Sequence, residues 1–122
     1  MKLLNVLVID DETVIGDACR LVLSKKGCTV THCITGKEGL NKIRQNAYDF
    51  ILLDIKLPDI DGTRILRIIR QESVPAPVIV MTGYSTMSNA LEAMKLGAAD
   101  YLSKPFTEDD LLATIEKLFP DS

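Results

Sequence analysis

The sequence predicts a single α/β domain in which five parallel strands form one sheet with helices on both faces. Five short apolar segments alternate with five segments of helical periodicity, and the connections between them are short. Several of the apolar segments are continuous, as expected for strands that are covered on both faces. Parallel strands joined by right-handed helical crossovers give a doubly wound sheet.

The five expected strands are apolar segments that each run into a polar residue or a turn. They cover residues 4–9, 29–33, 50–53, 78–81 and 101–103. In the third, four apolar residues are followed at once by Asp54 and then by a polar loop that contains Pro58. Asp54 is therefore expected where a buried strand meets water, at the edge where α/β sheets bind ligands.

Each expected helix carries an apolar stripe at helical spacing. Gly27 and Gly97 are expected to end the first and fourth helices as left-handed caps. We predict that Met87 and Met94 belong to the core. The predicted inward-facing residues are Val14, Ile15, Ala18 and Val22 in the helix from Glu12; Leu40 and Ile43 in the helix from Thr35; Ile65, Leu66, Ile68 and Ile69 in 63–71; Met87, Leu91 and Met94 in about 86–96; and Leu111, Leu112, Ile115, Leu118 and Phe119 in the last helix.

Composition indicates one compact globular domain over residues 1–122. Of the 122 residues, 47% are hydrophobic and 25% are charged, which is ordinary for a domain with its own core. The chain has neither a bilayer-spanning apolar run nor a signal peptide, so we expect no membrane contact and a cytoplasmic location. The net charge is −3 and the cations are scattered, which argues against direct binding to nucleic acid.

The sequence gives no support for a disulfide or a zinc site. Cys28 and Cys33 have an odd separation and are expected on opposite faces of one strand. The C-x-x-C spacing of metal sites is absent. His32, the single histidine, is expected to be structural and to lie away from the strand ends that gather polar groups.

Five polar groups are predicted to gather at the carboxyl edge of the sheet: Asp10, Asp11, Asp54, Thr82 and Lys104. Two carboxylates about 4 Å apart repel by roughly 4 kcal/mol at an effective dielectric near 20, so this cluster needs a cation or a raised pKa. Oxygen ligands favour a hard divalent ion, and Mg²⁺ fits best because it keeps positions for waters and phosphate oxygens.

The same edge has the parts needed for phosphoryl chemistry. Lys104 supplies a positive charge, while the hydroxyl of Thr82 and the main-chain N–H of Gly83 supply neutral donors. A carboxylate can act as the nucleophile in covalent phosphoryl transfer. Asp54 is the central carboxylate and is the candidate for that role.

Taken together, these motifs resemble the receiver domain of response regulators in two-component signalling. They are the pair Asp10-Asp11 after the first strand, the Asp54-Ile-Lys-Leu-Pro-Asp-Ile-Asp-Gly62 segment after the third, Thr82-Gly83 after the fourth, and Tyr101-Leu-Ser-Lys-Pro-Phe106 after the fifth. Each motif is weak alone, but all four occur in order and cover essentially the whole chain. The resemblance implies a flavodoxin-like strand order of 2-1-3-4-5.

The resemblance implies roles for the acidic positions. Asp54 would be the phosphoacceptor. Asp11 and Asp54, with the main-chain carbonyl of Lys56, would ligate Mg²⁺, and Asp10 would assist through water.

The resemblance also implies roles for the residues after the fourth and fifth strands. Thr82 and Lys104 would bind phosphoryl oxygens. Tyr101 would be the aromatic switch residue that turns inward when Thr82 is drawn toward the phosphate. The Lys104–Pro105 bond would be cis.

By the same resemblance, the phosphoryl donor would be a phosphohistidine of a histidine kinase or a histidine phosphotransfer protein. The domain would phosphorylate and dephosphorylate itself as a signalling switch, without turnover of an outside substrate. Its output surface would combine the fourth helix, the fifth strand and the fifth helix, and would control a partner or an effector domain. Phosphorylation-dependent homodimerisation is left open.

No effector domain is expected within these residues. Residues 90–101 are similar to receivers of bacterial enhancer-binding transcription activators, which favours a fragment of a longer regulator over a stand-alone receiver. Lys56 and Tyr84 are large residues near the acceptor and are expected to hinder water, which predicts a long-lived phosphorylated form.

Two alternatives belong to other classes of protein. The segment from Asp59 to Thr63 looks like the D-x-D-G-T signature of haloacid-dehalogenase-type phosphatases, in which Asp59 would be the nucleophile. That signature should directly follow a strand, whereas Asp54 already ends the strand and Pro58 intervenes. A docking module that never takes phosphate would be expected to lack one of the polar groups, and none is missing.

Overall fold

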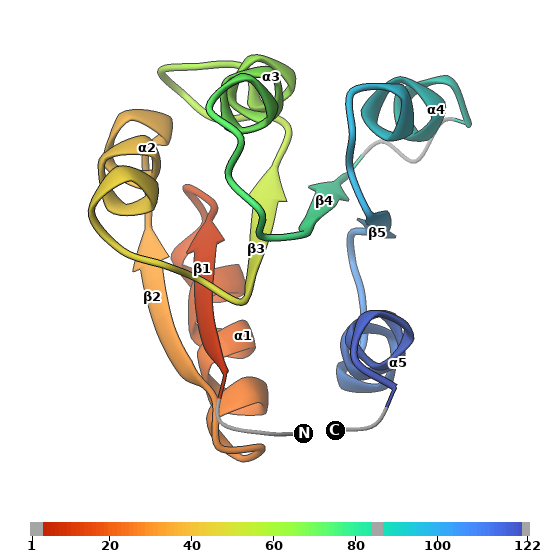
Figure 1. Cartoon of the computed structure of the whole chain (residues 1–122). Coiled ribbons are helices and arrows are strands. Elements are labelled where there is room, and N and C mark those ends of the chain that lie inside the picture. The colour runs from red at the N-terminus through yellow and green to blue at the C-terminus, as the bar shows by residue number, and fades with distance from the viewer. Residues whose placement is uncertain (1–3, 84–86, 121–122) are drawn as a thin grey trace.

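The computed structural model describes residues 4–83 and 87–120, in which five strands alternate with five helices (Figure 1). The strands are β1 (Asn5–Ile9), β2 (Thr29–Cys33), β3 (Phe50–Asp54), β4 (Val78–Thr82) and β5 (Asp100–Ser103). The helices are α1 (Thr13–Ser24), α2 (Gly36–Gln45), α3 (Gly62–Gln71), α4 (Met87–Lys95) and α5 (Glu108–Leu118). The predicted strands and helices are therefore present and agree closely with these bounds.

All four strand pairs are parallel, and the sheet has the order β2-β1-β3-β4-β5. The predicted fold class and strand order are confirmed. The register sets Asp54 opposite Met81 and Thr82 opposite Ser103, so the carboxyl ends of β3, β4 and β5 are nearly level.

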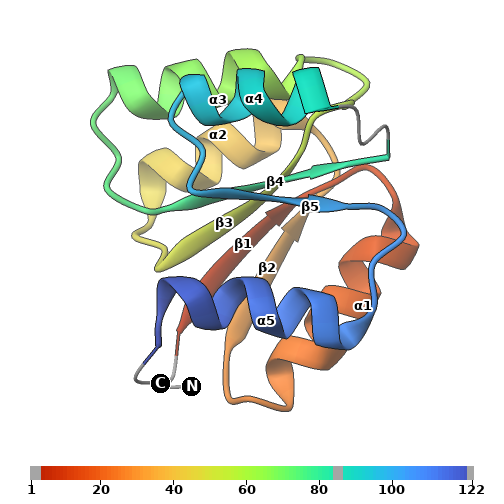
Figure 2. The ribbon, with the colours of Figure 1, turned by 90° about the vertical axis from the view of Figure 1, so that its right-hand side faces the viewer.

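Helices cover both faces of the sheet. In Figure 2 the sheet runs across the middle, with α2, α3 and α4 on one side and α1 and α5 on the other. Each side encloses its own apolar cluster. Among the described residues, no helix has the length and apolar character needed to cross a membrane.

Neighbouring residues of the central strands face different clusters. In β1, Leu7 and Ile9 pack toward α2 and α3, whereas Val6 and Val8 pack toward α1 and α5. The same alternation holds in β3 and β4. Because both faces are buried, these strands are continuous apolar runs in the sequence.

The predicted inward face of α1 is wrong by about one residue. Val14 is 75% exposed and Ala18 is also exposed, while Cys19 and Leu23 are buried against the sheet. Ile15 and Val22, which were also predicted to face inward, are partly buried and lie at the margin of the true face. Apolar residues on both sides of this helix fit the helical period equally well, so periodicity alone could not choose between two adjacent stripes.

The predicted inward face of α4 is also wrong. Leu91 is 52% exposed and Met94 is 41% exposed, while Ala90 and Ala93 are buried. The side chain of Met87, also predicted to be core, lies outside the described residues. The helix approaches the sheet through its small residues, and the larger apolar side chains remain at the surface.

Left-handed residues end two helices as predicted. Gly27 has φ of 86° after α1, and Gly97 has φ of 102° after α4. Residues with a side chain rarely adopt this backbone conformation, which explains why glycine occupies both positions.

Candidate phosphoryl-acceptor site

The polar residues predicted to converge lie at the carboxyl ends of the strands. Asp10 follows β1, Asp54 ends β3, Thr82 ends β4 and Lys104 follows β5. A hollow of about 240 Å³ lies at this edge. It is lined by Asp11, Glu12, Asp54, Ile55, Lys56, Thr82, Gly83 and Lys104. We use "the rim" for the polar residues Asp10, Asp11, Glu12, Asp54, Lys56, Thr82 and Lys104.

Main-chain hydrogen bonds fix the backbone around Asp54. The N–H of Ile55 donates to the carbonyl of Met81 at 3.1 Å, and the N–H of Gly62 donates to the carbonyl of Ile55 at 2.7 Å. A Cβ on Gly62 would lie 2.4 Å from the carbonyl oxygen of Asp54, so only glycine allows this approach. The loop after β3 is thus packed directly against the backbone of Asp54.

Asp54 is a buried carboxylate that faces one cation. It is 4% exposed, and its Oδ2 lies 3.4 Å from Nζ of Lys104. Burial, with a further contribution from the charge of Asp10, raises the pKa of Asp54 from 3.8 to about 6, although Lys104 acts in the opposite direction. The site therefore favours any cation that lowers the cost of keeping Asp54 ionised.

Three carboxylates surround the ammonium group of Lys104. Its Nζ lies 2.7 Å from Oδ2 of Asp10, 2.9 Å from Oε1 of Glu12 and 3.4 Å from Oδ2 of Asp54. Burial opposes the charge, but the bonds to Asp10 and Glu12 outweigh burial and hold the pKa of Lys104 above its ordinary value. The main-chain N–H of Lys104 donates to the carbonyl of Thr82 at 2.8 Å, which places the start of this side chain at the end of β4. The Lys104–Pro105 bond is cis, as predicted.

The rim has a donor set suited to a hard divalent ion. Carboxylate oxygens of Asp10, Glu12 and Asp54 lie within 4.8 Å of one another. Asp10 is fully buried, and its Oδ2 accepts no hydrogen bond of good geometry from the described residues, although Nζ of Lys104 is close. These oxygen ligands fit Mg²⁺, and a divalent ion would offset the negative charge of the fully buried Asp10.

The other predicted rim residues lie around the same hollow. Asp11 is exposed and lines it, but its carboxylate is not in the group formed by Asp10, Glu12 and Asp54. Lys56 is exposed, and its main-chain N–H donates to Oδ1 of Asp54 at 3.4 Å. Thr82 is 5% exposed and lines the hollow beside Asp54. Tyr84, which the sequence also implicated, lies outside the described residues.

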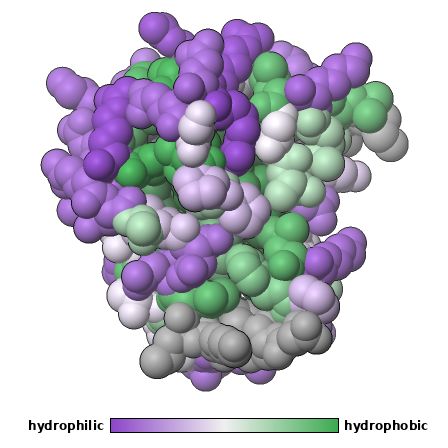
Figure 3. Space-filling view, in the orientation of Figure 1, coloured by the Kyte–Doolittle hydropathy of each residue, from purple (hydrophilic) through white to green (hydrophobic). Residues whose placement is uncertain are grey.

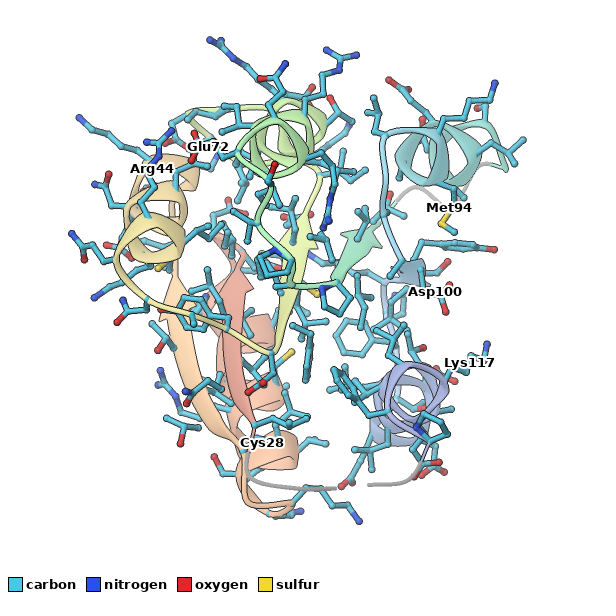
Figure 4. The ribbon with its side chains drawn as sticks, viewed as in Figure 1. Cys28, Arg44, Glu72, Met94, Asp100 and Lys117 are labelled. Atoms are coloured by element: carbon cyan, nitrogen blue, oxygen red, sulfur yellow. The ribbon has the colours of Figure 1, made fainter. Side chains whose placement is uncertain are left out.

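The predicted output surface exposes apolar side chains. Tyr101, the predicted switch residue, is 38% exposed. Met94 of α4, Asp100 of β5 and Lys117 of α5 lie on the same side of the molecule in Figure 4. In Figure 3 hydrophobic side chains gather at the corner over α4, whereas the surface over α2 and α3 is mostly hydrophilic.

The loop acids Asp59 and Asp61 are engaged elsewhere. Oδ1 of Asp59 accepts from the N–H of Gly36 at 2.8 Å, and its Oδ2 accepts from the N–H of Lys37 at 2.9 Å. These bonds lower the pKa of Asp59. Asp61 caps α3 by accepting from the N–H of Thr63. Both oxygens of Asp59 thus hold the start of α2, which argues against its role as a nucleophile.

A larger hollow lies at another part of the molecule. It has a volume of about 400 Å³ and lies between the end of α2 and residues 72–76. Arg44 and Glu72, which point toward each other in Figure 4, form an ion pair of 2.7 Å at its wall. It contains none of the converging acids, so its size alone does not make it the functional site.

Sequence reasoning missed one residue of the rim and one residue beside it. Glu12 was assigned only to the start of a helix, yet it contacts Lys104. His32 was expected away from the rim, but its Nε2 lies 2.7 Å from the carbonyl oxygen of Asp10. A Cβ on Gly16 would lie 2.1 Å from the His32 ring, so the glycine of α1 makes room for it. The parallel pairing of His32 with Val8, two residues before Asp10, could have indicated this neighbourhood.

Comparisons with known proteins identify the family of this chain. The family model of the response regulator receiver domain matches residues 6–116. The chain is 38% identical over 112 residues to the transcriptional regulatory protein DltR of Streptococcus agalactiae, covering 92% of this chain and 50% of the relative. It is 35% identical over 114 residues to the transcriptional regulatory protein ZraR of Escherichia coli, covering 93% of this chain and 26% of the relative. The chain thus spans half or less of the length of these two relatives.

Solved structures give the same assignment. The receiver domain of the Francisella response regulator 1452 is 34% identical with a TM-score of 0.90, covering 96% of this chain and 97% of that one. A CheY-like receiver domain protein from Methanospirillum hungatei is 33% identical with a TM-score of 0.90, covering 98% and 96%. Fold, strand-end residues and sequence similarity all agree, and the chain belongs to the response regulator receiver domains of two-component systems.

Proposed function

We propose that this domain is a phosphorylation-dependent switch in which Asp54 accepts a phosphoryl group from a phosphohistidine of a histidine kinase or a histidine phosphotransfer protein. One observation carries the proposal: a buried carboxylate ends β3 with the ammonium group of Lys104 3.4 Å away. The nucleophile and the cation that would offset the negative charge of the phosphoryl group are therefore already neighbours.

The residues of the chain supply the nucleophile and the donors for an in-line transfer. An oxygen of ionised Asp54 attacks phosphorus, the P–N bond to the donor imidazole breaks, and its electron pair stays on the imidazole nitrogen. Lys104 holds Asp54 in its ionised form and then donates to a phosphoryl oxygen. The hydroxyl of Thr82, which lines the same hollow, donates to a second phosphoryl oxygen.

Mg²⁺ is the metal that the rim fits. Asp10, Asp11 and Asp54, together with the main-chain carbonyl of Lys56, would hold it, with Asp10 acting through water. When bound, Mg²⁺ supplies positive charge for the phosphoryl oxygens. Lys56 lines the hollow and is exposed, and its long side chain would restrict the approach of hydrolytic water.

The output surface is proposed to be α4, β5 and α5. Leu91, Met94 and Tyr101 are all more than a third exposed on α4 and β5. Movement of Thr82 toward a phosphoryl group would draw Tyr101 inward and change this surface for an effector domain, a separate partner or a second copy of the chain. To move the equilibrium from 1:99 to 99:1 requires about 5.5 kcal/mol of differential stabilisation, which several charge-assisted hydrogen bonds can provide.

The test is phosphorylation by a small donor. The purified domain with Mg²⁺ and acetyl phosphate should gain the mass of one phosphoryl group. Asp54→Asn should abolish the gain, and Asp59→Asn should not. A wild-type protein that gains no mass, or loss of labelling in Asp59→Asn alone, contradicts the proposal.

A further inference from the structure

Glu12 occupies the N-cap position of α1 without capping the helix. Its side chain makes no cap hydrogen bond, and its Oε1 instead accepts from Nζ of Lys104 at 2.9 Å. The side chain of Glu12 is 59% exposed, whereas that of Lys104 is 10% exposed. Glu12 is therefore the solvent-accessible partner in an ion network that is otherwise buried.

The ammonium group of Lys104 has three N–H donors, and three carboxylates already surround it. A phosphoryl group on Asp54 would bring up to three further oxygens and nearly two negative charges to this ammonium group, while the esterified carboxylate of Asp54 would lose its own charge. These oxygens would compete with Asp10 and Glu12 for the donors of Lys104, so full binding of the phosphoryl group weakens one of those two contacts.

The three carboxylates differ in how easily each can be separated from the ammonium group of Lys104. Asp10 is fully buried, so its separation from Lys104 would leave an unpaired buried charge. Asp54 carries the incoming group and cannot move away from it. Glu12 is exposed, and its carboxylate lies within 4.8 Å of that of Asp54, where a phosphoryl group of nearly two negative charges would repel it.

We infer that Glu12 is a displaceable counterion, which holds Lys104 in the unphosphorylated protein and competes with the phosphoryl group for it. The inference rests on the proposed phosphorylation of Asp54. Glu12 makes and breaks no covalent bond, and it acts as a positioning residue through Lys104. Its presence keeps Lys104 aimed into the rim at the cost of weaker phosphoryl binding.

Glu12→Gln removes the charge with little change of shape. Because the side chain does not cap α1, the variant should fold normally. The second-order rate constant for phosphorylation by acetyl phosphate with saturating Mg²⁺ should rise about fivefold, the size expected for loss of one exposed ion pair and its repulsion. The dissociation constant for beryllofluoride, a non-transferable phosphoryl mimic, should fall by about the same factor.

Glu116→Gln on α5 is the matched control. It removes one exposed carboxylate from the end of α5 that is farther from Lys104 along the chain, and both quantities should stay at wild-type values. Thermal melting by circular dichroism checks that the variants are folded. A damaged structure would lower the rate constant, so an increase cannot arise from a merely structural role of Glu12.

The outcomes separate the two proposals. If the wild type takes phosphate on Asp54 but Glu12→Gln reacts at an equal or lower rate, the inference about Glu12 is wrong and the proposed function stands. If calorimetric titration shows that Glu12→Gln binds Mg²⁺ several-fold more weakly, Glu12 is a metal ligand instead. If the wild type takes no phosphate, the proposed function fails and the inference fails with it.

Discussion

Asp54 is a residue whose ionisation the fold makes costly. Its pKa lies near 6 because the carboxylate is buried beside Asp10, and the opposing effect of Lys104 is smaller. An acid with a raised pKa binds protons more strongly in the folded state than in the unfolded state. The folded state is therefore favoured while Asp54 is protonated at low pH, and this contribution to stability is lost as the pH rises from about 4 through 6.

Asp54→Asn should stabilise the metal-free domain at neutral pH. The two pKa values, 3.8 and about 6, correspond to roughly 3 kcal/mol of destabilisation by ionised Asp54 above pH 7. Urea denaturation in EDTA should show a gain for the variant that increases between about pH 4 and 6 and then stays nearly constant. Asp59→Asn is the control and should show no gain, because the pKa of Asp59 is lowered. A gain for Asp54→Asn that is independent of pH would contradict this account.

At the scale of elements, the loop after β3 is joined to the start of α2. Asp59 accepts from the N–H groups of Gly36 and Lys37, while Thr35 accepts from the N–H of Glu38 at 3.2 Å. Three N–H groups of the first turn of α2 are thus satisfied, two of them by a residue more than twenty positions away. From the sequence, Thr35 was predicted only to begin a helix. No pattern in the sequence indicated that Asp59 caps the same helix from a distant loop.

Asp59→Ala should lower the free energy of unfolding by about 1 kcal/mol, the usual cost of losing a capping carboxylate. It should leave phosphorylation of Asp54 possible, because both carboxylate oxygens of Asp59 bind N–H groups at the start of α2. Chemical denaturation measures the first effect and mass gain with acetyl phosphate the second. Asp109→Ala, at an exposed first-turn position of α5, serves as the control with a smaller loss of stability.

The contact of α1 with β2 depends on a pair of residues. Gly16→Ala would place a methyl group within 2.6 Å of three atoms of the His32 ring, so the ring must move and lose its bond to the carbonyl of Asp10. We expect a loss of about 1–3 kcal/mol, as for overpacking in a core. In the His32→Ala background the space of the imidazole ring is free, so Gly16→Ala should lower the free energy of unfolding by less or should raise it.

A double-mutant cycle by urea denaturation measures this coupling. An interaction energy above about 1 kcal/mol supports the close packing of the two residues. Equal effects of Gly16→Ala in the wild-type and His32→Ala backgrounds would mean that the ring is not held in this place.

At the scale of the whole molecule, metal binding should raise stability. The rim gathers carboxylates that repel one another in the absence of a divalent ion, so Mg²⁺ should bind the folded state in preference to the unfolded chain. At a Mg²⁺ concentration of 100 times the dissociation constant, the gain is about 2.7 kcal/mol by mass action. Thermal melting against Mg²⁺ concentration should show this shift for the wild type and a much smaller one for Asp54→Asn. Equal shifts in both proteins would place the ion away from the rim.

The sequence by itself determined the order of elements, the parallel sheet and the edge at which the polar groups gather. These follow from local patterns, because apolar runs, glycines and prolines act over a few residues and parallel strands bring their carboxyl ends to one side. Asp10, Asp54, Thr82 and Lys104 were predictable for this reason.

Only the tertiary structure decided which faces of α1 and α4 are inward and which side chains meet across the rim. Helical periodicity allowed two neighbouring stripes on α1, and on α4 small residues rather than large ones pack toward the sheet. Glu12 and Lys104 are 92 positions apart, and their contact depends on where β5 ends relative to the start of α1. Such a contact is set by how separate elements pack in space, which no local pattern in the chain records.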